Sequence, residues 1–139
     1  MKLYRIAQAK NITIDKEDMI DRARYRLKDN GKEIGYLCIQ SNIHPKYFML
    51  EQFKIDPAYQ GQHLGTKLMN EALNDSRWKS KPIIVSPMPY KDAGPIGGPA
   101  YAKQVEDLAS MYRHFGFVDF PDWQGWLILD RTGKPTEQK

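Results

Sequence analysis

Two neighbouring extended segments, residues 19–27 and 32–40, are marked out by the pattern of apolar and polar positions along the chain. Apolar and polar residues alternate over residues 22–26, which is typical of a strand that buries one face, and residues 34–39 form an apolar run. The link between them, residues 28–31, contains the pair Asn30-Gly31, which readily takes the positive φ angles of a tight turn. The pattern therefore predicts an antiparallel hairpin.

Further strands are expected on both sides of this hairpin. One follows the turn signal around Pro45, and a nearly continuous run of β-branched residues is typical of a buried central strand flanked on both faces. The expected strands are residues 3–7, 47–55, 82–86, 117–120 and 126–130. The turn-rich link 121–125 makes the last two a closing hairpin, whereas residues 11–17 are expected to form a polar connection or a single helical turn.

Two helices are predicted where apolar residues recur at steps of three and four. The first is expected over residues 61–78, and the second over residues 102–115, ending at Gly116. Residues 87–99 hold four of the nine prolines and three of the ten glycines, which excludes a regular element there. That segment is either a loop that covers a substrate or a plain surface connection.

Chain length and composition indicate one globular domain. With 139 residues, of which 41% are hydrophobic, the chain can bury a core without disulfides or metals. We expect residues 1–130 to form the domain and residues 131–139 a flexible tail. The single cysteine, Cys38, lies in an apolar run, which favours a buried hydrophobic role over a catalytic thiol. No apolar stretch is long enough for a signal peptide or a membrane span, which predicts a cytoplasmic protein.

The net charge of +4 favours an anionic ligand or partner, such as a nucleotide cofactor, an acidic protein or nucleic acid. The basic residues are scattered and interleaved with acidic ones, which is typical of a solvated surface. A basic nucleic-acid-binding domain stays open as an alternative, because residues 22–26 mix three arginines with a tyrosine. The same residues alternate as a strand should, so a surface hairpin is the stronger interpretation.

A glycine-containing turn, residues 60–65, leads directly into the first predicted helix. Backbone N–H groups at a helix N-terminus are unpaired and carry a partial positive charge, so such a turn can bind a phosphate or pyrophosphate. Gly61 and Gly65 let the backbone approach an anion closely. Glycine spacing alone is equally consistent with a steric requirement of the tight turn.

The wider stretch around this turn resembles the GNAT acetyltransferase superfamily. The family signature is an apolar strand, a proline and then Gln/Arg-x-x-Gly-x-Gly/Ala at the start of a helix. Gln60, Leu64 and Gly65 match it, and Gly61 is common in the family. His63 occupies the position of the family's middle glycine, which is a departure from the pattern.

A second match lies in the later helix, which resembles the family's Tyr-x-x-x-Gly-Phe ending. Tyr112, Gly116 and Phe117 fall on the expected positions, whereas Val105 stands where the family often has an asparagine that contacts the cofactor. The resemblance covers roughly residues 33–130. It implies an α+β (mixed α/β) fold, with a central, mostly antiparallel twisted sheet of about six to seven strands, helices on both faces and a shortened N-terminal helical region.

The resemblance implies an N-acetyltransferase that moves the acetyl group of acetyl-CoA to a primary amine of a small molecule or protein by direct attack. The pantetheine arm is expected beside the strand that ends at Ile55, and the pyrophosphate on the turn that follows. The expected cofactor contacts are Phe53, Ile55, Gln60, Gly61, Gln62, His63, Leu64, Gly65 and Thr66.

Two catalytic candidates follow. By resemblance, Tyr112 is the general acid that protonates the leaving sulfur of coenzyme A, with a core tyrosine as the alternative. Glu51 shares strand parity with Phe53 and Ile55, so it is expected to face the acceptor cleft and act as base, directly or through water. The alternative is a solvated glutamate on an exposed strand.

The remaining candidates carry weaker predictions. His44 is expected in a loop, His114 near a helix C-terminus favours the helix dipole, and Trp123 and Trp126 line an acceptor pocket, a dimer contact or the core. No histidines or acids have metal-ligand spacing, so no metal is expected. A non-catalytic acyl-CoA-binding or interaction module on the same fold stays open. The sequence identifies neither the acceptor nor the oligomeric state, including a possible homodimer.

Overall fold

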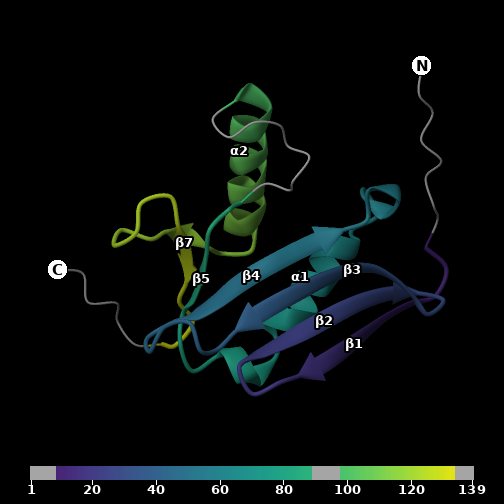
Figure 1. Ribbon diagram of the computed structural model, residues 1–139, viewed down its shortest axis with the longest axis horizontal. Coiled ribbons are helices and arrows are strands. Elements are labelled where there is room, and N and C mark those ends of the chain that lie inside the picture. Colours follow the sequence, from purple (N-terminus) through teal and green to yellow (C-terminus); the bar gives the residue numbers. More distant parts are fainter. Residues whose placement is uncertain (1–8, 89–97, 134–139) are drawn as a thin grey trace.

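A seven-stranded sheet with two α-helices forms the fold of the computed structural model, which describes residues 9–88 and 98–133 (Figure 1). The strand order is β1-β2-β3-β4-β5-β7-β6, and only the β4–β5 pair is parallel. The strands are β1 (Ile12–Asp18), β2 (Arg22–Asp29), β3 (Lys32–Gln40), β4 (Phe48–Ile55), β5 (Ile83–Val85), β6 (Val118–Asp119) and β7 (Leu127–Leu129). The predicted mixed α+β class with a mostly antiparallel sheet is confirmed.

The predicted hairpin is confirmed as β2 and β3, which pair antiparallel along their length. Asn30 and Gly31 form its turn with φ angles of 50° and 82°. The left-handed conformation is the one that an Asn-Gly pair adopts at low cost, which explains why the chain reverses there. Strand β2 begins only at Arg22, because residues 19–21 form a turn in which the Met19 N–H donates to the Arg22 carbonyl at 2.8 Å.

The expectation for residues 11–17 was wrong, because strand β1 begins at Ile12, runs through the rest of this segment and pairs antiparallel with β2. Ile12 and Ile14 are partly buried and pack against the core, whereas Thr13 between them and the charged residues 15–18 are exposed. Cross-strand ion pairs on that outer side, Asp15 with Lys28 and Glu17 with Arg26, let a polar sequence form a strand. The strand expected over residues 3–7 lies outside the described residues.

Both predicted helices are present with different ends. Helix α1 (Leu64–Leu73) stops before the expected end at residue 78, because Asp75 caps a short 3₁₀ turn (Ser76–Trp78) by accepting from the Arg77 N–H at 3.1 Å. Helix α2 (Pro99–His114) begins three residues earlier than expected, with Pro99 in its first turn, where proline is favoured. Gly116 follows α2 with a φ of 103°, as the sequence predicts.

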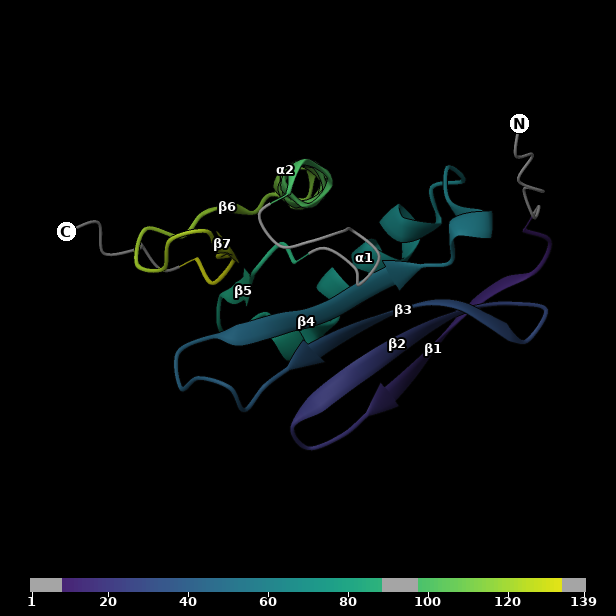
Figure 2. The ribbon, with the colours of Figure 1, turned by 45° about the horizontal axis from the view of Figure 1, so that its top comes forward.

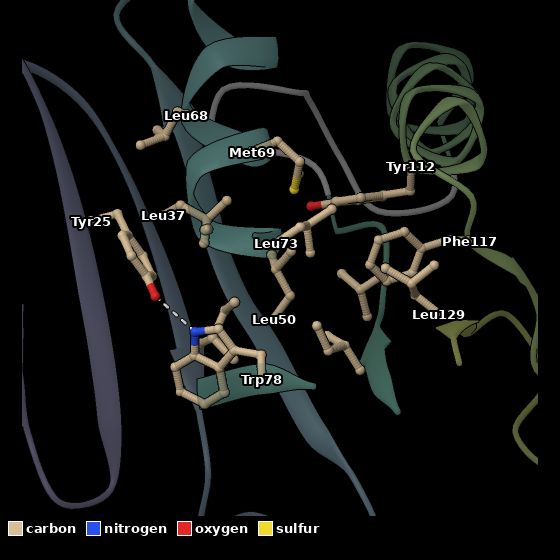
Figure 3. Close-up of a cluster of buried hydrophobic side chains, with 14 of the residues drawn as sticks. Tyr25, Leu37, Leu50, Leu68, Met69, Leu73, Trp78, Tyr112, Phe117 and Leu129 are labelled. Carbon is tan, nitrogen blue, oxygen red and sulfur yellow. Dashed lines mark hydrogen bonds between the residues drawn. The ribbon is translucent and has the colours of Figure 1, made fainter. Parts of the chain in front are cut away.

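Helices α1 and α2 pack on the same face of the sheet (Figure 2). Met69 from α1 and Tyr112 from α2 belong to one core cluster together with Tyr25, Leu37 and Leu50 from the strands (Figure 3). The expectation of helices on both faces therefore differs from the structure, since no described helix covers the opposite face. The shortened N-terminal region explains this, because β1 and β2 are joined by a tight turn with no helix between them.

Strands β4 and β5 separate after a short parallel contact, and this separation positions the site. Their pairing runs from Phe48 opposite Ile83 to Leu50 opposite Val85, while β4 continues to Ile55. A β-bulge lies where the strands part: Cys38 of β3 is opposite Gln52 and Ile39 is opposite Leu50. Glu51 is therefore the extra residue of β4. Among the described residues, no helix has the length and apolar character needed to cross a membrane.

Candidate functional site

A cleft of about 250 Å³ opens between the end of β4, the start of α1 and the last turn of α2. Its walls combine the apolar side chains of two elements with the backbone of the turn that joins β4 to α1. The lining residues are Phe53, Ile55, Tyr59, Gln60, Gly61, His63, Leu64, Gly65, Thr66, Met111 and Phe115. The structure thus brings together eight of the nine predicted cofactor contacts, all except Gln62.

The turn at residues 60–63 is built from two left-handed residues, Gly61 with φ 83° and His63 with φ 60°. His63 is the N-cap residue of α1 and makes no side-chain capping bond. The first helical hydrogen bond of α1 runs from the Lys67 N–H to the His63 carbonyl at 3.1 Å. Helix geometry leaves the N–H groups before Lys67 without an acceptor inside the helix, so they present donors and a partial positive charge at the cleft.

Two glutamine side chains of the same turn form hydrogen bonds with other parts of the protein. Gln60 Nε2 donates to the Ile55 carbonyl at 3.2 Å, and Gln62 Oε1 accepts from the Ala9 N–H at 3.1 Å. These two bonds tie the turn to the end of β4 and to the chain that leads into β1. The side-chain amides of Gln60 and Gln62 therefore hold the turn in place, and its backbone lies at the cleft.

Asp29, at the end of β2, anchors the base of the turn. Its carboxylate accepts from the N–H groups of Lys10 and Asn11 at 3.1 and 3.0 Å and from the Tyr59 hydroxyl at 3.1 Å. The bonds from Asn11, Lys10 and Tyr59 lower the pKa of Asp29 below its ordinary value, although burial opposes the shift. An ionised Asp29 thus links the predicted hairpin to the short 3₁₀ helix Pro57–Tyr59, which precedes the turn.

Gly65 is needed for close packing at the cleft. A Cβ on this residue would lie 3.2 Å from Phe53 Cζ and 3.6 Å from Ile55 Cγ1. The first distance is tighter than ordinary van der Waals contact, so a side chain here would press on β4 and occupy part of the cleft. The glycine of the sequence signature therefore has a steric role as well as a place in the cleft wall.

Three lining residues, Tyr59, Met111 and Phe115, were missed by sequence reasoning. Met111 and Phe115 lie four residues apart and so share one side of α2. Both flank Tyr112, which the family ending did single out. The spacing could have revealed them, because any ligand that meets Tyr112 must pass over neighbouring positions of the same helix.

Tyr112 lies beside the cleft but does not line it. The residue is 5% exposed, and its ring packs against Phe117 with centroids 5.6 Å apart. Its side chain points from α2 into the core toward Met69 and Leu73 (Figure 3). The described contacts are those of a core tyrosine whose hydroxyl reaches the region between α1, α2 and β4.

The parity argument for Glu51 was wrong, because the bulge in β4 interrupts the alternation. Leu50 and Phe53 lie opposite Ile39 and Leu37 on the helix-covered face, so Glu51 and Gln52 both lie on the other face. Glu51 does not line the cleft that holds Phe53 and Ile55. Its Oε2 atom is buried and has no hydrogen-bond partner among the described residues.

The remaining candidates do not line the cleft. His44 is in a loop, where its Nδ1 accepts from the Lys46 N–H at 3.0 Å, and His114 is in the last turn of α2. Trp123 and Trp126 pack edge to face at 5.1 Å, and Trp123 also packs on Tyr47 at 6.2 Å. Cys38 is fully buried, as predicted. Within the described residues, no three His, Cys, Asp or Glu side chains are grouped to hold a metal ion.

Comparison with known proteins gives a consistent result. A model of the acetyltransferase (GNAT) domain matches residues 21–119. A search of curated proteins by sequence finds no match. Escherichia coli ElaA superposes with a TM-score of 0.55 at 16% identity, over 77% of this chain and 66% of that chain.

Two ligand-bound structures are also similar. PaiA N-acetyltransferase from Thermoplasma acidophilum, in complex with coenzyme A, has a TM-score of 0.53 at 16% identity, over 78% of this chain and 58% of that chain. A GNAT family acetyltransferase from Elizabethkingia anophelis with acetyl-CoA bound has a TM-score of 0.59 at 13% identity, over 86% and 98%. These likenesses show the fold. Because the family model matches well over half of the 139 residues, the chain belongs to the GNAT acetyltransferase family.

Proposed function

We propose that this protein moves the acetyl group of acetyl-CoA to a primary amine by direct attack. The observation that carries the proposal is the cleft. It is lined by the N-terminus of α1, which has no side-chain cap, by the end of β4, where β5 no longer pairs with it, and by apolar residues of α2. A diphosphate and an apolar arm need these two kinds of surface side by side. The net charge of +4 also favours an anionic cosubstrate.

In this proposal the pyrophosphate binds the backbone N–H groups of residues 61–66, since the Gln60 N–H donates to the Pro57 carbonyl at 3.3 Å and the side chains of Gln60 and Gln62 are engaged with Ile55 and Ala9. The pantetheine arm lies beside β4 where β5 no longer pairs with it, in the manner of an added strand next to Phe53 and Ile55. Acetyl-CoA supplies an activated acyl group as a thioester.

Proton transfer is assigned to the two catalytic candidates. A lysine-like amine has a pKa of about 10.4, so forming its neutral state at pH 7 costs roughly 4–5 kcal/mol. We assign Glu51 as the base that accepts this proton, directly or through water, because its buried Oε2 has no other partner among the described residues. We assign Tyr112 as the acid for the leaving thiolate, because its hydroxyl reaches the core between α1 and α2 near the parting of β4 and β5 (Figure 3).

Calorimetric titration with acetyl-CoA and with free coenzyme A tests the binding step, and release of coenzyme A thiol in the presence of amines tests transfer. We expect saturable binding of both nucleotides and amine-dependent thiol release. Tyr112→Phe should lower turnover by roughly 100-fold while acetyl-CoA affinity changes little, as expected for loss of a general acid. Absence of binding at millimolar acetyl-CoA would refute the proposal, and binding without turnover for any amine would identify a non-catalytic acyl-CoA module instead.

A further inference from the structure

Arg24, Cys38 and Glu51 lie in one row across the sheet face that no described helix covers. Arg24 of β2 is opposite Cys38 of β3, and Cys38 is opposite the bulge of β4 that contains Glu51. Neighbouring strands lie about 4.8 Å apart, so the Arg24 and Glu51 backbones are about 10 Å apart. Cys38 between them is small and fully buried, and both Glu51 and Arg24 act electrostatically on its thiol.

The two charged ends of this row are incompletely satisfied. Arg24 Nε and Glu51 Oε2 are the buried side-chain atoms without a hydrogen-bond partner among the described residues. Such atoms are costly unless something pairs with them. The other basic side chains of β2 are engaged in ion pairs: Arg22 with Asp21, Arg26 with Glu17 and Glu33, and Lys28 with Asp15. Arg24 takes part in no ion pair between described residues, and its guanidinium lies 5.7 Å from the centre of the Tyr36 ring.

The position of the row limits how an acceptor can reach the acyl group. Glu51 is the residue next to Leu50, where β4 and β5 stop pairing. On the helix side this point is closed, because Leu50, Val85 and Tyr112 are buried in the core cluster. An amine that reaches the parting of β4 and β5 must therefore come from the other face, where Glu51 and Arg24 lie.

We propose that the acceptor is an amino carboxylic acid, bound with its ammonium group at Glu51 and its carboxylate at Arg24. This inference rests on the proposed function. In one zwitterionic ligand, the carboxylate can accept from Arg24 Nε and the ammonium group can donate to Glu51 Oε2. A simple amine would leave Arg24 Nε without a partner. A free α-amino acid carries its two charged groups on one carbon, so one small ligand can meet both residues of the row.

The transfer step balances without another reactant. The ammonium group gives one proton to Glu51, and the amine nitrogen then forms the C–N bond to the acyl carbon as the C–S bond breaks. The nitrogen loses a second proton, the thiolate takes up one, and one proton leaves to solvent. The products are the N-acetylated amino acid and coenzyme A.

The test compares each of the twenty standard amino acids with its C-terminal amide in the thiol-release assay. An amide is less basic, so more of it is neutral, and without carboxylate recognition the amide should react faster. We expect at least one free acid to exceed its amide by about 10-fold or more in kcat/KM, as expected for a charge-assisted pair. Amides that react as well as every acid would overturn the inference while leaving acetyl transfer intact.

Variants on the same strand locate the recognition. Arg24→Gln should lower kcat/KM for the preferred acid by about 10- to 100-fold, chiefly through KM, and change that for the amide by less than about 2-fold. Arg26→Gln removes the same charge from a residue paired with Glu17 and Glu33, and should change neither value by more than about 2-fold. An equal loss in both variants would show a general charge effect and refute the site.

Controls separate this inference from the proposed function. Acetyl-CoA affinity, measured by calorimetry, should be the same in wild type, Arg24→Gln and Arg26→Gln. If Arg24→Gln fails to fold, Arg24→Lys keeps the cation and should retain part of the acid preference. If acetyl-CoA does not bind the wild type, the proposed function fails first; if it binds and only amines without a carboxylate are acetylated, the acceptor assignment alone fails.

Discussion

The two ends of helix α1 differ in what their polar backbone groups bind. At the N-terminal end, the cap residue His63 makes no side-chain capping bond and the backbone N–H groups face a cleft. At the C-terminal end, side chains of the protein form hydrogen bonds with the backbone groups. The Arg131 guanidinium donates to the Leu73 carbonyl, and Asp75 caps the following turn through the Arg77 N–H.

A side-chain cluster at the C-terminal end joins three segments of the chain. The Tyr25 hydroxyl accepts from Trp78 Nε1 at 2.8 Å (Figure 3). The same hydroxyl donates to Asp75, and Lys16 forms an ion pair with Asp75. Burial opposes ionisation of Asp75, but the bonds from Lys16, Tyr25 and the Arg77 N–H outweigh it and lower the pKa of Asp75. The contrast indicates that the C-terminal end contributes stability and the N-terminal end is kept for a ligand.

Filling the cleft should have the largest effect, and that effect should be on acetyl-CoA binding. Gly65→Leu places a side chain against Phe53, whose Cζ lies 3.2 Å from the Cβ position, and projects it into the space between α1 and α2. We expect acetyl-CoA affinity to fall by about 100-fold, which corresponds to about 2.7 kcal/mol. Calorimetric titration measures the change.

The matched control for this variant is Asn70→Leu, which adds the same side chain to an exposed position of the same helix outside the cleft. Its acetyl-CoA affinity should match wild type within about 2-fold. Asn70→Leu should unfold near the wild-type urea midpoint, because leucine is at least as good a helix former as asparagine. In Gly65→Leu the close contact with Phe53 opposes the better helix propensity of leucine, so its affinity is measured under conditions where the variant is folded. Equal affinities for Gly65→Leu and Asn70→Leu would show that the ligand lies elsewhere.

Removing a hydrogen bond from the cluster at the C-terminal end of α1 should lower the free energy of unfolding without changing acetyl-CoA affinity. Tyr25→Phe removes the hydroxyl that accepts from Trp78 Nε1, and Trp78 is fully buried. A buried donor left without an acceptor costs about 1–3 kcal/mol in the free energy of unfolding. Urea denaturation measures this loss, and acetyl-CoA affinity of the folded variant should be unchanged. A weakened affinity with normal stability would contradict the division of roles between the two ends.

The acid dependence of stability offers a smaller test of the same cluster. Asp75 has a folded pKa below its ordinary value of about 3.9, so it contributes stability above that pH and loses the contribution as pH falls through the folded pKa. Asp75→Asn lacks this titration. The difference in unfolding free energy between wild type and Asp75→Asn should therefore be larger at pH 6 than at pH 3. A difference that stays constant over this range would show that the Lys16 and Tyr25 bonds do not depend on the charge.

Much of the fold follows from local sequence, because the strongest signals are short-range. The Asn30-Gly31 turn, the apolar steps of α1 and the glycine after α2 each act over a few residues. Strand β1 could not be predicted this way, since its charged residues are stabilised by partners on β2, such as Lys28 for Asp15. The end of α1 was also misplaced, because Asp75 ends it through contacts with the distant Lys16 and Tyr25.

The candidate site also has parts that local sequence predicts and parts that depend on tertiary packing. The turn at residues 60–65 was predictable, because its glycines and the following helix lie together in the chain. The place of Glu51 was not, because a bulge depends on how β3 pairs with β4 and shifts every later residue to the other face. Met111 and Phe115 reach the cleft only through the packing of α2 beside α1.

The smallest expected effect concerns His63, which holds the left-handed N-cap position with φ 60°. A residue with a Cβ pays about 1 kcal/mol there, so His63→Gly should be more stable than His63→Ala by about that amount. If the N-terminal end binds through backbone N–H groups, both variants should keep acetyl-CoA affinity within about 3-fold of wild type. A parallel loss of affinity in both would assign the contact to the imidazole, and the N-terminal end would then resemble the C-terminal end in using a side chain.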